Sequence, residues 1–336
     1  MAKEALFYTT LKDRKVQCFL CNHNCVINDG GLGICAVRQN NAGVLVSLNY
    51  AQVVASHIDP IEKKPLFHFL PGTRTFSLAC PGCNFQCDFC QNWQISQVKE
   101  TKGAMNSLHI APEMLIRKAI EGACPSVAYT YTEPTIYFEY AYECAQLARA
   151  QGLKNIFVTN GFMSEDALNQ MHPFLDAANV DLKSMSEEFY RTSCKAELGP
   201  VLETITRMKE LGIWVEVTTL VIPGANDTED EFDDAARFIA SVDKDMPWHI
   251  SRFHPDYRRS GEPTSQETLQ EAYTIAKQRG LSYVYIGNIA SSDGESTYCP
   301  ACNKLIIERA GYLVKKKNIK DGCCGFCGKE IAGAGL

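Results

Sequence analysis

The sequence predicts an α/β fold, in which helices cover a parallel sheet and a small cysteine-rich module lies at each end of the chain. Three observations predict this fold. Strand-like apolar runs alternate with amphipathic stretches between about residues 76 and 290. The segments before and after this region contain few helix signals. Most of the 16 cysteines fall in three short segments. The alternation fits six or seven β/α units in a complete or partial barrel, and an open doubly wound sheet is the alternative.

The elements of the central region follow from apolar periodicity and from the turn residues between the runs. We expect strands at residues 75–79, 126–132, 155–160, 179–184, 214–222, 248–253 and 282–288. We expect helices at 111–123, 135–151, 164–172, 200–211, 227–241 and 265–279. The predicted domains are an N-terminal cysteine-rich module (1–70), the barrel (71–290) and a zinc-ribbon-like module (291–336).

Composition and charge narrow the class of protein. The 336 residues are 46% hydrophobic and 21% charged, which is ordinary for a folded soluble protein. The net charge of -6 argues weakly against non-specific nucleic-acid binding. The first residues lack the apolar region of a signal peptide, and no apolar run reaches the roughly 18 residues of a membrane helix. We therefore expect a cytoplasmic protein without a membrane partner.

Cysteine clustering in a reducing compartment favours metal sites over disulfides. Four cysteines lie within residues 18–35, four within 80–90 and five within 299–327. Cys124, Cys144 and Cys194 stand alone, and we expect them to be small buried residues.

The central cluster directly follows the first predicted barrel strand. Cys83, Cys87 and Cys90 form a C-x3-C-x2-C pattern on a loop at the edge of the sheet where α/β folds place their chemistry. A cubane iron–sulfur cluster normally takes four thiolates, so three would leave one iron open to another ligand. The alternative is a zinc site that adds Cys80 to these three.

This pattern resembles that of the radical S-adenosylmethionine (SAM) superfamily. The resemblance implies a partial (β/α)6 TIM-type radical SAM barrel in which Cys83, Cys87 and Cys90 hold a [4Fe-4S] cluster. SAM would bind the open iron and be cleaved reductively to a 5'-deoxyadenosyl radical that abstracts hydrogen from a substrate. Phe89 matches an aromatic residue that the family often carries before the last ligand. Cys80 has no assigned role.

Polar residues near the other strand ends are the predicted SAM contacts. The resemblance assigns this role to Glu133, Asn160, Asp181, Lys183 and His249. Tyr131 and Thr132 stand where the family often has two glycines before the glutamate. A buried structural ion pair is the alternative for Asp181 and Lys183, and a core position is the alternative for His249.

Each flanking module contains four cysteines at metal-ligand spacing. The C-terminal set has two C-x2-C knuckles, which indicate zinc, with a second iron–sulfur cluster or rubredoxin-type iron as alternatives; its members are Cys299, Cys302, Cys324 and Cys327. Cys323 is left over. The N-terminal set is less regular and fits zinc or an iron–sulfur cluster; its members are Cys18, Cys21, Cys25 and Cys35.

Several longer segments extend the resemblance over most of the chain. These segments are "CFLCNHNCVINDGGLGICAVRQN", "GCNFQCDFCQNWQIS", "YTYTEPT", "DLKS", "SRFHPDY" and "TYCPACNKLIIERAGY". They are similar to AmmeMemoRadiSam-system radical SAM enzymes, a group related to pyruvate formate-lyase activating enzymes.

The resemblance implies an oxidoreductase that acts on a protein or peptide, like a glycyl-radical activase. RNA or a small molecule is the alternative substrate, and a non-catalytic iron–sulfur or zinc scaffold is a third hypothesis. The implied partners are an electron donor such as ferredoxin or flavodoxin, and Memo-like and AMMECR-like proteins.

Overall fold

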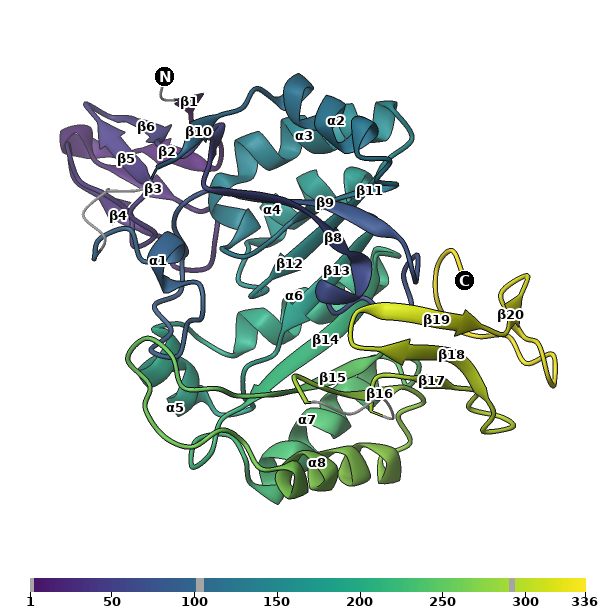
Figure 1. Ribbon diagram of the computed structural model, residues 1–336. Helices are drawn as coiled ribbons and strands as arrows, with labels where there is room; N and C mark the ends of the chain where they lie inside the picture. Colours follow the sequence, from purple (N-terminus) through teal and green to yellow (C-terminus); the bar gives the residue numbers. More distant parts are fainter. Residues whose placement is uncertain (1–2, 101–105, 290–293) are drawn as a thin grey trace.

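A mostly parallel sheet of eight strands forms the centre of the molecule (Figure 1). The structure, a computed structural model, describes residues 3–100, 106–289 and 294–336. The spatial strand order is β16-β15-β14-β13-β12-β11-β9-β8. Neighbours from β9 to β16 pair in parallel, and β8 pairs antiparallel with β9. This open, mostly parallel sheet confirms the predicted α/β class.

The strands of this sheet are β8 (Ala55–Pro60), β9 (Arg74–Ala79), β11 (Ser126–Tyr129), β12 (Lys154–Thr159), β13 (Ala177–Asp181), β14 (Trp214–Val221), β15 (Trp248–Arg252) and β16 (Val284–Gly287). The connecting helices are α1 (Trp93–Ser96), α2 (Pro112–Glu121), α3 (Phe138–Ala150), α4 (Glu165–Met171), α5 (Glu187–Phe189), α6 (Gly199–Glu210), α7 (Glu229–Val242) and α8 (Gln266–Gln278). Each predicted strand and helix of the central region overlaps one of these elements.

Smaller sheets lie at both ends of the chain. The N-terminal strands are β1 (Lys3–Glu4), β2 (Tyr8–Thr10), β3 (Val16–Cys18), β4 (Val26–Ile27), β5 (Arg38–Asn41), β6 (Val44–Ser47) and β7 (Gln52–Val53), with β10 (Leu108–His109) paired to β7. The C-terminal strands are β17 (Thr297–Tyr298), β18 (Leu305–Ala310), β19 (Leu313–Lys317), β20 (Ile319–Lys320) and β21 (Cys323–Cys324).

Local signals explain where several helices begin. The side chains of Ser164, Thr228 and Ser265 accept a hydrogen bond from a backbone N–H in the first turn of α4, α7 and α8. The first turn of α7 also carries three acidic residues, which favour the positive end of the helix dipole. Thr228 is therefore the N-cap of α7.

The main sheet extends into the predicted N-terminal module. Strand β8 lies within the predicted N-terminal module, yet it hydrogen-bonds to β9 of the main sheet along its whole length. The main sheet thus begins before residue 70. The second predicted boundary, at residues 290 and 291, lies outside the described residues.

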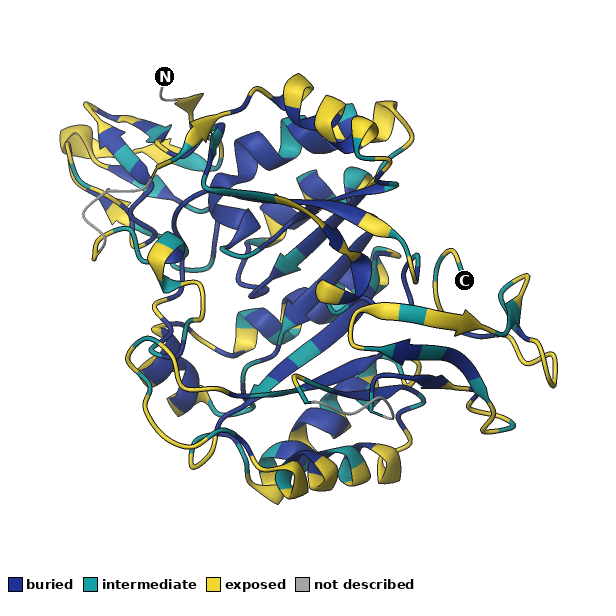
Figure 2. Cartoon of the chain, in the orientation of Figure 1, coloured by how far each residue is buried: buried dark blue, intermediate teal, exposed yellow. Residues whose placement is uncertain are grey.

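The inner strands of the main sheet are buried, as parallel strands covered by helices are expected to be (Figure 2). The exposed residues of α2, α7 and α8 lie on one side of each helix, which shows that the helices cover the sheet with their apolar faces. None of the helices in the described ranges is long and apolar enough to cross a membrane.

Candidate functional site

The loop that carries Cys83, Cys87 and Cys90 begins directly after β9. Its backbone is held by a π-helical turn, Tyr190–Cys194, that follows α5. Gln86 N–H donates to the Cys194 carbonyl at 2.9 Å, and Asp88 N–H donates to the Ser193 carbonyl at 3.1 Å. The loop is therefore fixed by a segment about a hundred residues away in sequence.

Gly82 lets this loop approach the N-terminal module. Its φ is +101°, a value that L side chains rarely adopt. A Cβ at this position would lie 2.8 Å from Cγ1 of Val37. The glycine therefore allows close contact between the cysteine loop and the module that precedes it.

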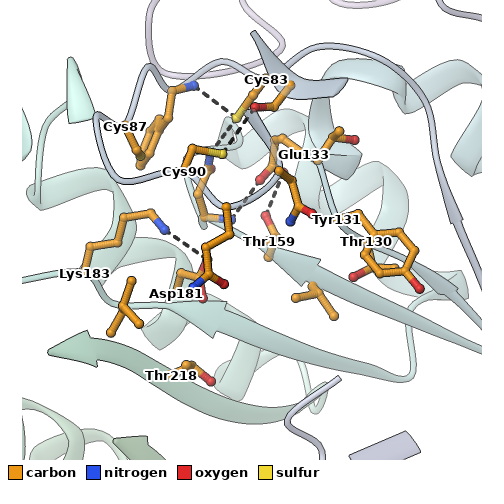
Figure 3. A pocket seen from close by; sticks show the side chains of 18 of the residues that line it. Cys83, Cys87, Cys90, Thr130, Tyr131, Glu133, Thr159, Asp181, Lys183 and Thr218 are labelled. Atoms are coloured by element: carbon orange, nitrogen blue, oxygen red, sulfur yellow. Dashed lines mark hydrogen bonds and ion pairs between the residues drawn. The ribbon is translucent and has the colours of Figure 1, made fainter. Parts of the chain in front are cut away.

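The three cysteines line one large cavity at the C-terminal ends of the parallel strands (Figure 3). The cavity has a volume of about 500 Å³ and an open mouth. Other predicted site residues line it as well, namely Glu133, Asn160, Asp181 and Lys183. The structure therefore brings together seven of the eight residues predicted for this site. Among the described residues that line the cavity, Cys83, Cys87 and Cys90 are the only cysteines.

The donor set fits a cluster with one open iron better than it fits the zinc alternative. Cys80 is fully buried and does not line the cavity. Nor do Cys80 and the three loop cysteines form a compact ligand group in the described part of the chain. Thr218 lines the same cavity, and its buried hydroxyl has no hydrogen-bond partner among the described residues. A bound molecule could supply that partner.

Glu133 organises one wall of the cavity. Its Oε1 accepts hydrogen bonds from the Thr135 hydroxyl at 2.6 Å and the Thr159 hydroxyl at 2.7 Å. Its Oε2 accepts from the Asn160 backbone N–H at 2.8 Å. Burial raises the pKa of Glu133, although these donors oppose the shift. The carboxylate thus ties the loop after β11 to the end of β12.

The surroundings of the cysteine sulfurs contain hydrogen-bond donors. Phe85 N–H donates to Cys83 Sγ at 3.3 Å, and Asn160 Nδ2 lies 3.8 Å from the same sulfur. Cys90 Sγ lies 3.3 Å from the Ser96 hydroxyl. Burial raises the pKa of the Cys83 and Cys90 thiols, so metal binding must release protons here.

Cys194 has a neighbour that the sequence did not indicate. It is buried, as predicted for the isolated cysteines, and so are Cys124 and Cys144. The Cys194 thiol, however, is hydrogen-bonded to the Cys87 side chain. This hydrogen bond and burial raise the pKa of Cys87 well above its usual value. No sequence signal links these two cysteines, because the contact forms only when the π-helical turn packs on the loop.

Asp181 and Lys183 form an ion pair on the opposite wall, with Nζ and Oδ2 3.0 Å apart (Figure 3). Lys183 Nζ also lies 5.8 Å from the centre of the Phe89 ring. Burial disfavours the charged amine, but the neighbouring Asp181 carboxylate, with smaller contributions from Cys87 and Cys194, outweighs burial, so the pKa of Lys183 is raised. The pair faces the cavity, where it can contact a ligand.

The structure does not bring His249 to this cavity. His249 is the second residue of β15, near the N-terminal ends of the strands, and its Nε2 lies 2.7 Å from Glu216 Oε2. Glu216 also accepts from the backbone N–H groups of Phe67 and His68. His249 thus belongs to a buried polar network, as in the core alternative, because its position along the strand places it away from the cysteine loop.

Residues from the predicted flanking modules complete the cavity. Lys63 and Lys64 line it next to Tyr131, and all three are hydrogen-bonded to Asp59. Burial lowers the pKa of Lys64 to about 8. Tyr312, between β18 and β19, also lines the cavity. Sequence reasoning missed Lys63, Lys64 and Tyr312 because it assigned their segments to the flanking modules and not to the barrel.

The C-terminal cysteines form a compact metal site. The sulfurs of the four predicted residues lie within 4.8 Å of one another; they are Cys299, Cys302, Cys324 and Cys327. Two sulfur–sulfur distances are 3.7 Å. A tetrahedral ion with bonds of about 2.3 Å places its sulfurs about 3.8 Å apart, as zinc does. Cys323 lies outside the group, as expected.

The N-terminal cysteines line one small cavity, together with His23 and Arg38; they are Cys18, Cys21, Cys25 and Cys35. Within the described ranges they do not form a compact group like the C-terminal one. Burial raises the pKa of the Cys35 thiol to about 11. His23 Nε2 is 2.8 Å from the carbonyl oxygen of Asn84, so this cavity adjoins the central loop.

Comparisons with known proteins show which sequences and folds this chain is similar to. A model of the radical SAM superfamily matches residues 78–239. An uncharacterized protein of Methanocaldococcus jannaschii is 44% identical over 98% of both chains. The pyruvate formate-lyase 1-activating enzyme of Escherichia coli is 21% identical over 64% of this chain and 93% of its own. A radical SAM methyltransferase from Sphaerobacter thermophilus has a similar fold, with a TM-score of 0.52, 17% identity and coverage of 70% of this chain and 71% of that one.

Proposed function

Because this chain belongs to the radical SAM superfamily, we propose that Cys83, Cys87 and Cys90 bind a [4Fe-4S] cluster whose open iron takes SAM. The observation that carries this proposal is the convergence of three thiols, and no fourth among the described residues, on one cavity at the C-terminal edge of the sheet. When bound, the reduced cluster supplies the electron that cleaves SAM to methionine and a 5'-deoxyadenosyl radical, which abstracts hydrogen from the substrate.

The polar residues of the cavity orient the cofactor in this proposal. Asp181 and Lys183 present one negative and one positive group to the cavity, which suits the amino and carboxylate groups of SAM. Glu133 holds the backbone of Asn160 in place, and Asn160 in turn lies beside Cys83. The unpartnered Thr218 hydroxyl is available to a bound molecule.

The substrate that we propose is a protein or peptide, as for an activating enzyme of glycyl-radical proteins. Two observations support this class. The cavity opens to solvent, so a segment of a larger molecule can enter it. The chain is also similar to a pyruvate formate-lyase activating enzyme over most of that enzyme's length. The proposed partners are a ferredoxin or flavodoxin as electron donor, and Memo-like and AMMECR-like proteins.

The C-terminal hairpin supports RNA as a second candidate substrate. Strand β19 exposes three consecutive lysines, Lys315 to Lys317, and none of them has an ion-pair partner among the described residues. The turn before β19 places Tyr312 in the cavity wall. Cationic groups next to exposed aromatic rings are typical of surfaces that bind single-stranded nucleic acid. This local charge contrasts with the net charge of -6 for the whole chain.

The test of the proposed reaction is anaerobic. The reconstituted protein, SAM and a strong reductant are combined, and 5'-deoxyadenosine is quantified. We expect product with the wild type and with Cys124→Ala, which removes a buried thiol away from the cavity. We expect no product with Cys83→Ala, Cys87→Ala or Cys90→Ala. Unchanged product formation in any of these three variants would overturn the ligand assignment.

A further inference from the structure

The three cysteine sets of this chain differ in the distances between their sulfur atoms. In the described ranges, only the C-terminal set places its ligand atoms within 4.8 Å of one another. The central triad and the N-terminal set both line a single cavity without such close spacing. When several thiolates bind one metal ion, their sulfur atoms must lie close to one another. When each thiolate binds a different iron of a cluster, the sulfur atoms lie farther apart. The N-terminal set thus shares the wider spacing of the central triad.

The cavity between the N-terminal cysteines is enclosed and mostly apolar. Cys18, Cys21 and Cys35 are buried, and Cys25 is half-buried. Leu20, Ile27 and Ile136 contribute aliphatic walls. An enclosed site protects an iron–sulfur cluster from water and oxidants, and such burial is one of the factors that set its potential.

Arg38 lines the same cavity and has one N–H group that donates to none of the described residues. Its side chain is 1% exposed and lines the cavity. Its terminal nitrogens donate to the Leu6 carbonyl at 2.8 Å and to the Glu139 carboxylate. Its Nε, however, has no hydrogen-bond partner among the described residues. A buried N–H without a partner is costly, and a thiolate or sulfide of a cluster would satisfy it.

We infer that Cys18, Cys21, Cys25 and Cys35 bind a second iron–sulfur cluster of the [4Fe-4S] type, with the Arg38 guanidinium as a hydrogen-bond donor to it. This cluster is next to the proposed SAM site. His23 lines its cavity and contacts the Asn84 carbonyl, and Asn84 Oδ1 accepts from Asn160 Nδ2 at 2.8 Å. Asn160 in turn lies 3.8 Å from Cys83 Sγ.

Metal analysis of the full-length protein tests this inference without any activity measurement. Iron, acid-labile sulfide and zinc are quantified after anaerobic reconstitution. For the wild type we expect about eight irons, about eight sulfides and about one zinc per chain. About four irons with about two zincs would overturn the inference, because the N-terminal site would then hold zinc.

Variants assign the metals to their sites. Cys18→Ser with Cys25→Ser should lose about half of the iron and keep the zinc, whereas Cys124→Ala should keep both. Because the double variant could misfold, a second variant carries Cys83→Ala, Cys87→Ala and Cys90→Ala with the N-terminal cysteines intact. It should retain about four irons and about four sulfides. Complete loss of iron from this variant would contradict a second cluster.

Discussion

The two ends of this chain each carry four cysteines, and they differ in spacing and in the part of the barrel that they contact. The C-terminal sulfurs are close enough for one tetrahedral ion, whereas the N-terminal sulfurs are spread around an enclosed cavity. The C-terminal module contacts the segment between β8 and β9 and adds Tyr312 to the cavity wall, and the N-terminal module contacts the cysteine loop that follows β9. The same ligand chemistry can therefore serve different purposes at the two ends.

Hydrogen bonds attach the C-terminal module to the segment before β9. Arg309 donates to the Phe67 carbonyl and to the Thr297 hydroxyl, each at 2.7 Å. The chain end pairs with residues 68 and 69, and His68 Nδ1 lies 2.7 Å from the Ala332 carbonyl. The N-terminal module, by contrast, hydrogen-bonds to the loop that carries the proposed cluster ligands. The two modules therefore make most of their contacts with different parts of the main sheet.

The largest effect should come from removing the C-terminal metal. Cys302→Ser should reduce zinc to near zero and destabilise the module, because a structural zinc contributes about 10–16 kcal/mol to small domains. Trypsin should then cut the three lysines of β19 faster, while the iron content stays the same. Cys323→Ser is the matched control and should keep the zinc. Equal zinc content in Cys302→Ser and the wild type would contradict the assigned ligand set.

A smaller effect is expected at the attachment of this module to the barrel. Arg309→Met leaves Glu62 buried beside an apolar side chain, because Arg309 Nε lies 3.7 Å from Glu62 Oε1. Breaking a buried ion pair on one side costs about 3–5 kcal/mol. Urea unfolding should show this loss, and Lys316→Met, at an exposed position, should change the free energy of unfolding by less than about 0.5 kcal/mol. Similar stabilities of the two variants would mean that Arg309 does not hold the module in place.

The hydrogen-bond network that joins Glu216 to His249, Phe67 and His68 should make the stability of the protein depend on pH. Burial raises the pKa of Glu216, but the hydrogen bonds from His249 and Trp214, together with the nearby His249 and His68 rings, outweigh burial and leave that pKa below its usual value. A depressed carboxylate pKa gives stability that is present above the unfolded pKa of about 4.3 and is lost as pH falls below it. Glu216→Gln should therefore be less stable than the wild type by about 1–3 kcal/mol at pH 7.

The difference in stability between the wild type and Glu216→Gln should shrink as pH falls below about 4.3, the unfolded-state pKa, toward the lower pKa of the folded state, where the wild-type carboxylate becomes protonated. Thermal unfolding at several pH values measures this change. A difference that stays constant down to pH 3 would show that the charge of Glu216 does not contribute.

The smallest effect on stability is expected at the exposed lysines of β19. The same substitutions distinguish between the two proposed substrate classes. Replacement of Lys315, Lys316 and Lys317 by Ser should change the free energy of unfolding by less than about 0.5 kcal/mol per site. If RNA is the substrate, single-stranded RNA should bind the wild type in a salt-dependent way and the variant more weakly. Fluorescence anisotropy at two salt concentrations measures both. Absence of RNA binding by the wild type would leave the protein or peptide candidate.

Local sequence patterns were sufficient for the elements of the barrel. Apolar runs and caps are properties of neighbouring residues, so the seven parallel strands and the main helices could be placed from the sequence. The short spacing of the central and C-terminal cysteines likewise indicated two metal sites. Asp181 and Lys183 could be assigned to one face because side chains alternate along a strand.

Only the tertiary structure decided the contacts between residues distant in sequence. It paired His249 with Glu216, placed Cys194 against Cys87, and brought Lys64 and Tyr312 into the cavity wall. It also fixed the sulfur spacing that separates the compact C-terminal site from the N-terminal one. A sequence records the order of ligands along the chain, but the distance between their sulfurs depends on how the strands and loops that carry them pack together.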